Sequence, residues 1–136
     1  PKHLAKILGV MIEHVEADLC LSIEDCDGDN SFWIPTPILL IEEEGHYGTI
    51  EIGDQQSEFE KIVSLAHEVG HSILEASPSF GGYEEIIFKE AVAWYLGYDY
   101  FAEQGWIIHL GQYKERASLA LEKYIRSLNV KQQKNN

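Results

Sequence analysis

The sequence predicts an α+β fold, and three observations lead to this class. A helical hydrophobic pattern fills the first 19 residues, short β-prone runs follow up to about residue 54, and three helical segments come after Ser57. The 136 residues, 45% of them hydrophobic, are enough for one modest core. No internal repeat or linker divides the chain, so we expect residues 1–136 to form a single domain.

The first helix is predicted over residues 3–19, and β-structure is predicted after it. Its apolar side chains recur at helical spacing: Leu4, Ile7, Leu8, Met11, Ile12, Val15 and Leu19. Four β-prone runs lie between Asp, Gly, Asn and Pro residues: Leu21–Ile23, Phe32–Ile34, Ile38–Ile41 and Thr49–Ile52. A β-hairpin is expected between Ile38–Glu43 and Gly48–Gly53, with its turn around Gly45–His46.

Three helices are predicted in the second half of the chain. Ser57 and Glu60 have the spacing of a capping box, which begins a helix that runs to about Ala76. The segment 77–82 breaks the pattern, and a further helix is expected from Tyr83 to about Gln104. The last helix is predicted from Trp106 to about Leu128, followed by a frayed polar tail over 130–136.

The charge of the chain restricts its partners. Lys and Arg number 10 against 23 Asp and Glu, a net charge of −13, so we expect no binding to nucleic acid or to anionic lipid. The charge is uneven, with −17 over residues 1–110 and +4 over residues 111–136. We interpret the basic end as a solvated helix face and tail, with a docking surface for an acidic partner as the alternative.

Composition also suggests where the protein works. No apolar run is long enough to span a membrane, and no signal-peptide pattern is present at the start. Cys20 and Cys26 are too few for a disulfide scaffold. These features predict a cytoplasmic protein.

The predicted helix after Ser57 contains an HExxH motif, His67-Glu68-Val69-Gly70-His71. Residues four apart share a helix face, so both imidazoles can bind one metal ion. Glu68 lies about 100° round the helix, where it can reach a metal-bound water without binding the metal. Gly70 costs a helix interior about 1 kcal/mol relative to Ala, which suggests that another element packs closely there.

Two histidines leave a catalytic zinc site one protein ligand short. The extended pattern HExxHxxGxxH fails, because Leu74 and Ser77 stand where it requires Gly and His. The next predicted helix offers three glutamates, of which Glu90 is preferred because the small residues after it permit a close approach between the helices. Glu85 and then Glu84 are the alternatives.

The segments Ser64–Ile73 and Glu90–Trp94 together resemble the gluzincin metallopeptidases, most of all small ImmA/IrrE-type proteins and the minigluzincins. The resemblance is specific over residues 57–97 and only architectural before them. It implies a minimal zincin-like fold and one zinc ion held by His67, His71 and Glu90, with Glu68 as general base. It also implies a bacterial or phage origin and a regulatory protein partner.

We therefore expect a zinc-dependent endopeptidase that cleaves a protein or peptide. Glu68 would take a proton from the zinc-bound water, which attacks the peptide carbonyl, and would pass it to the leaving amine. A donor for the oxyanion is also needed. Its candidates are Tyr83, Tyr95, Tyr98, His46 and Tyr47.

Two other hypotheses remain open at this point. The first is a catalytically silent zinc-binding interaction module, phage-encoded or regulatory, built on the same scaffold. The second is a structural or inhibitory protein that binds its partner through the acidic surface.

Overall fold

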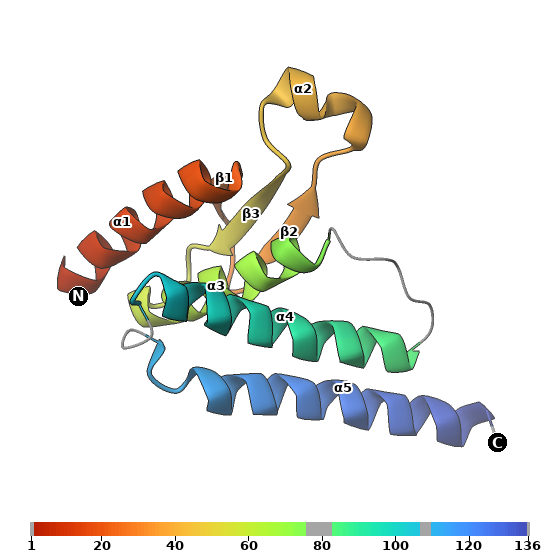
Figure 1. Cartoon of the computed structure of the whole chain (residues 1–136). Coiled ribbons are helices and arrows are strands. Elements are labelled where there is room, and N and C mark those ends of the chain that lie inside the picture. The colour runs from red at the N-terminus through yellow and green to blue at the C-terminus, as the bar shows by residue number, and fades with distance from the viewer. Residues whose placement is uncertain (1, 76–82, 107–109, 136) are drawn as a thin grey trace.

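The computed structural model describes residues 2–75, 83–106 and 110–135, and the α+β class is confirmed (Figure 1). A helix is followed by a small mixed sheet and then by three long helices. The elements are α1 (Lys2–Leu19), β1 (Ser22–Cys26), β2 (Phe32–Pro35), the 3₁₀ turn η1 (Ile38–Leu40), α2 (Ile41–Glu44), β3 (Gly48–Gly53), α3 (Glu58–Leu74), α4 (Tyr83–Glu103) and α5 (Tyr113–Asn135). The predicted helices over 3–19, from Ser57 and from Tyr83 are thus present.

The central strand of the sheet is β3, in the order β1-β3-β2. It pairs parallel with β1 and antiparallel with β2, so that Thr49 lies opposite Ser22 on one side and Ile34 on the other. Ile50 and Ile52 of β3 are buried. Three of the four predicted β-prone runs are therefore confirmed as strands.

The fourth run, Ile38–Ile41, was wrongly predicted as a strand, and so was its hairpin with Gly48–Gly53. It forms η1 and the start of α2, and the strand antiparallel to β3 is β2. Proline has no N–H for a β-ladder, and Pro37 precedes η1 with a φ of −53°. The side chains of Ile38 and Leu39 are 86% and 93% exposed, so no buried face holds this segment extended.

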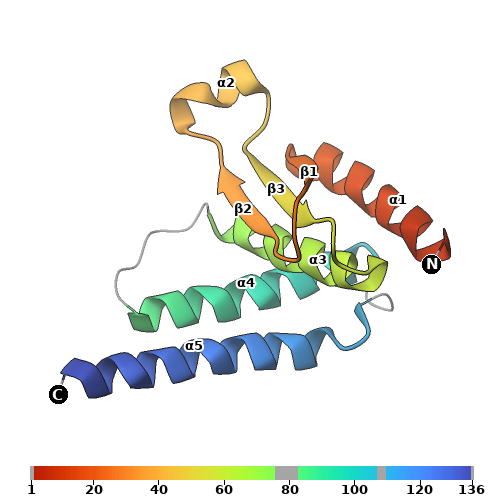
Figure 2. The same ribbon diagram turned by 180° about the vertical axis from the view of Figure 1, so that it is seen from behind.

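The hydrophobic core surrounds α3. Figures 1 and 2 both show α1 and the sheet on one side of α3, with α4 and then α5 on the other. Fully buried side chains come from α1, β3, α3, α4 and the turn before α5: Met11, Val15, Ile50, Ile52, Ile62, Leu65, Val69, Phe101 and Leu110. Packing against both of these layers holds α3 at a fixed place in the molecule.

The helices α3 and α4 make the most extensive contact between elements, and two glycines permit it. A Cβ at Gly70 would overlap the carbonyl oxygen of Ala93, and a Cβ at Gly97 would overlap that of Ala66. In each helix the two small residues are four apart and so lie on one face. The close packing expected at Gly70 is confirmed, and its partner is α4.

The last helix differs from its prediction at both ends. It was expected over Trp106–Leu128, but α5 begins at Tyr113 and continues to Asn135. The chain turns first, because Gly105 adopts a left-handed φ of 78° directly after α4. The tail over 130–136 was predicted to fray, yet residues 130–135 are helical. Its Lys and Gln residues are good helix formers, which explains the continuation.

Gly70→Ala and Gly97→Ala are each expected to lower the free energy of unfolding by about 1–3 kcal/mol, because the added methyl overlaps the backbone of the other helix. The control is Gly9→Ala in α1, where a Cβ would meet nothing within 4 Å, and it should stabilise the protein by up to about 1 kcal/mol. Urea denaturation measures all three changes. Stabilisation at all three positions would contradict the packing described above.

Candidate metal centre

The three ionisable residues of the HExxH motif lie in the second half of α3, and His71 is in its last turn. The helix begins with the predicted capping box, in which the Ser57 hydroxyl accepts from the Glu60 N–H and the Glu60 carboxylate accepts from the Ser57 N–H. His67 and His71 are one turn apart and both face α4. The imidazoles of both are about four-fifths buried.

Glu90 of α4 completes a cluster of three possible ligands. Its carboxylate Oε2 lies 2.9 Å from His67 Nε2 and 3.2 Å from His71 Nε2, and the two Nε2 atoms are 3.1 Å apart. Four-coordinate zinc with ordinary bond lengths would hold such atoms about 3.4 Å apart. The donors present therefore fit a metal ion to within a few tenths of an ångström, and these residues could hold one.

The electrostatics of the cluster favour a bound cation. Burial by itself would raise the pKa of Glu90, but hydrogen bonds and charge from His67 and His71 outweigh it and lower the pKa to about 2. Burial also acts to lower the pKa of His71, yet the hydrogen bond and charge of Glu90 raise it above the ordinary value of 6.5. The ionised carboxylate thus draws positive charge to this point.

Glu68 has a different environment from Glu90. It is only 5% exposed, and burial raises the pKa of its carboxyl above the ordinary value. Its Oε2 lies 3.6 Å from His67 Nδ1, so the two ring nitrogens of His67 face two different carboxylates. Glu68 lies outside the cluster formed by His67, His71 and Glu90.

Trp94 supports the site, a role that the sequence patterns described above did not assign to it. The indole stacks on the His67 ring with centroids 4.0 Å apart and planes within 7°. It lies one turn after Glu90, and the Tyr113 hydroxyl of α5 donates to its carbonyl oxygen at 2.7 Å. Trp94 is four residues after Glu90, and this helical spacing was the signal that could have placed both side chains on the same face of α4.

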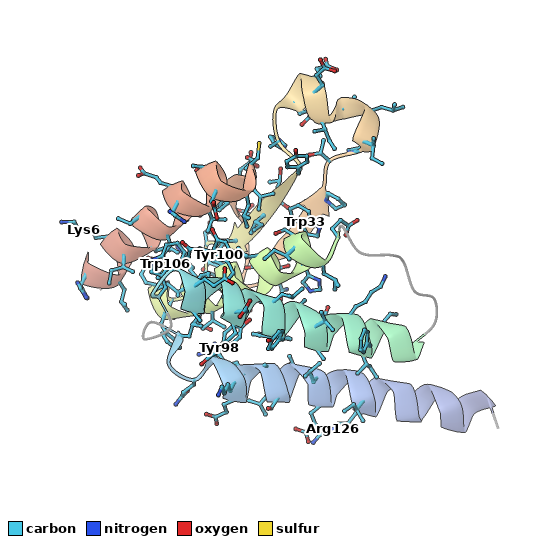
Figure 3. All side chains as sticks on the ribbon, in the orientation of Figure 1. Lys6, Trp33, Tyr98, Tyr100, Trp106 and Arg126 are labelled. Atoms are coloured by element: carbon cyan, nitrogen blue, oxygen red, sulfur yellow. The ribbon has the colours of Figure 1, made fainter. Side chains whose placement is uncertain are left out.

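Among the other expected site residues, the side chains of Tyr83, Glu84 and Glu85 lie outside the described part of the structure. Tyr95 is 65% exposed on the surface of α4. Tyr98 extends towards α5, where its ring lies 6.0 Å from that of Tyr113 (Figure 3).

The two candidates from the predicted hairpin tip lie around α2. His46 Nδ1 is 3.1 Å from the Thr36 hydroxyl, and its Nε2 is 3.6 Å from the Glu44 carboxylate. Tyr47 is more than half exposed. Both residues belong to the end of the sheet that carries α2, and neither is part of the metal-ligand cluster.

Comparisons with protein-family models, with curated proteins and with solved structures found no match to this chain.

The affinity for added Zn²⁺ is expected to fall by about tenfold or more between pH 7.5 and pH 5.5. Both histidines must lose a proton to bind a metal, and the raised pKa of His71 makes the proton a stronger competitor there. Competition with a chromophoric chelator at several pH values measures this. The matched control is His14→Gln, outside the cluster on α1, which should leave the pH dependence unchanged. An affinity independent of pH would contradict binding by these histidines.

Proposed function

We propose that this protein is a zinc-dependent metallopeptidase of the gluzincin type, which hydrolyses peptide bonds in a protein or peptide. The observation that carries the proposal is the convergence of Glu90 from α4 on both histidines of the motif, with the buried Glu68 beside them. A purely structural metal site has no need of such an additional carboxylate.

Two histidines and one glutamate are a ligand set typical of catalytic zinc, because three protein ligands leave one position for water or substrate. His67, His71 and Glu90 would hold the ion. When bound, zinc supplies the Lewis acid that polarises the scissile carbonyl and makes water more acidic.

Glu68 is the proposed general base and acid. Its carboxylate accepts a proton from the attacking water as the new carbon–oxygen bond forms, and then donates this proton to the amine as the carbon–nitrogen bond breaks. The pKa raised by burial suits this exchange, because it brings the basicity of the carboxylate nearer to neutral pH.

The sheet offers a surface for an extended substrate. β2 is an outer strand, paired with β3 on one side, and it also contacts α3. Phe32 and Ile34 of β2 are about half exposed. A peptide that adds to this edge by backbone hydrogen bonds would lie along α3, the helix that carries the motif.

The expected setting is the cytoplasm of a bacterium or of a phage-infected cell, with a regulatory protein as partner. None of the helices in residues 2–75, 83–106 and 110–135 is long and apolar enough to cross a bilayer. The charge of −13 disfavours nucleic acid as the direct partner.

Glu68→Gln is expected to lower peptide cleavage by about 100-fold or more, because an amide cannot take up the proton. Its zinc content should equal that of the wild type. The matched control is Glu13→Gln on the exposed face of α1, which should cleave like the wild type. Cleavage of a proteome-derived peptide library, followed by mass spectrometry, gives the measurement.

Undiminished cleavage by zinc-loaded Glu68→Gln would contradict the mechanism. A zinc-loaded wild type that cleaves nothing in the library would contradict peptidase activity. It would instead support the catalytically silent zinc-binding module.

A further inference from the structure

A cavity of about 650 Å³ opens directly beside the metal-ligand cluster. It lies between the N-terminal half of α3, the face of α5 and the loop that joins β1 to β2. His67 and Trp94 form part of its wall, while Arg116 and Lys123 of α5 line another part. When a substrate is bound at the cluster, the substrate side chains next to the bound position can therefore enter this cavity.

The walls of the cavity are held by hydrogen bonds. The Ser64 hydroxyl donates to Gln56 Oε1 at 2.6 Å, and Gln56 Nε2 donates to the Ser31 hydroxyl at 2.8 Å. The Gly28 N–H donates to Asp54 Oδ1, which ties the β1–β2 loop to the segment that leads into α3. These bonds hold the β1–β2 loop against the start of α3 and so fix one wall of the cavity.

Two cations and two carboxylates line this space, but the carboxylates have other roles or lie in solvent. Glu60 Oε1 accepts from the Ser57 N–H in the capping box, and its Oε2 forms a long ion pair of 3.9 Å with Arg116 Nη1. Asp29 is exposed on the loop. Lys123 is also exposed, and no ion pair of it is seen among the described residues.

Two basic side chains on one wall of a cavity are unusual for this chain. Residues 1–110 carry a net charge of −17, with four basic side chains among them. The basic residues are concentrated in 111–136, and α5 brings two of them to the cavity beside His67. The Arg116 guanidinium lies 5.2 Å from the centre of the Phe59 ring, which supports it at the wall.

We propose that this cavity is a specificity subsite that binds a carboxylate of the substrate next to the scissile bond, through Arg116 and Lys123. The inference rests on the proposed peptidase function and names the substrate class: peptides with an acidic group at one position beside the cleaved bond. A guanidinium can hold such a carboxylate by paired hydrogen bonds, and the lysine adds a second cation.

The test is cleavage of a peptide library by the zinc-loaded protein, with the C-termini of the peptides amidated. The residues beside the cleaved bonds should be enriched in Asp or Glu at one position. For a matched pair of peptides made from the best sequence, kcat/KM should be about tenfold higher with Glu than with Gln there. The other source of a carboxylate is the C-terminus of the peptide itself. If a library with free C-termini is cleaved only next to the last residue, the subsite binds the carboxylate of the chain end.

Arg116→Gln should reduce the Glu-over-Gln ratio of kcat/KM towards one. Lys123→Glu changes an exposed side chain and should reverse the preference towards a basic residue. The control is Arg126→Gln, because Arg126 pairs with Glu122 at 2.7 Å and extends away from the body of the molecule (Figure 3). This control should keep the wild-type ratio.

Failure of the inference and failure of the proposed function give different results. Cleavage without acidic enrichment, or with enrichment that survives both Arg116→Gln and Lys123→Glu, overturns the subsite and leaves the peptidase intact. Absence of all cleavage by the zinc-loaded wild type overturns the peptidase and the subsite together. If Arg116→Gln fails to fold, which circular dichroism shows, Lys123→Glu decides the question.

Discussion

The backbones of α3 and α4 touch at two points, where Gly70 meets Ala93 and Gly97 meets Ala66. The side chain of a glutamate has a limited reach, so the Glu90 carboxylate can contact both histidines of α3 only if α3 and α4 approach closely. The two contacts have the same four-residue spacing on both helices, and they fix the rotation of α4 as well as its distance. Trp94 and Glu90 then face α3 together. The cluster, the stacked indole and one end of the cavity all depend on this approach.

The two carboxylates at the centre illustrate how environment divides roles between identical groups. Glu90 lies between two imidazoles, which outweigh its burial and lower its pKa to about 2. For Glu68 the burial prevails, and its pKa is raised. An anion that stays charged suits a metal ligand, whereas a carboxylate of raised pKa suits proton transfer.

Much of this arrangement could be predicted from the sequence, because it depends on local patterns. The capping box at Ser57, the helical spacing of the histidines and the cost of Gly70 each have a short-range signal. The segment 38–41 was wrongly predicted because its apolar run resembles a buried strand, whereas Pro37 before it and the lack of a covering layer favour a 3₁₀ turn. The cavity could not be predicted, since it joins α3 to α5 and a loop that are far apart in the chain.

The central claim is that Glu90 completes a three-residue metal site with the HExxH histidines. Elemental mass spectrometry of protein purified without chelator tests it directly, on the wild type, on Glu90→Ala and on the matched variants Glu84→Ala and Glu85→Ala. The account predicts nearly one zinc per chain in the wild type and in both matched variants, and much less in Glu90→Ala. Full zinc retention by Glu90→Ala, or a wild type that binds no metal even after zinc is added, would contradict it.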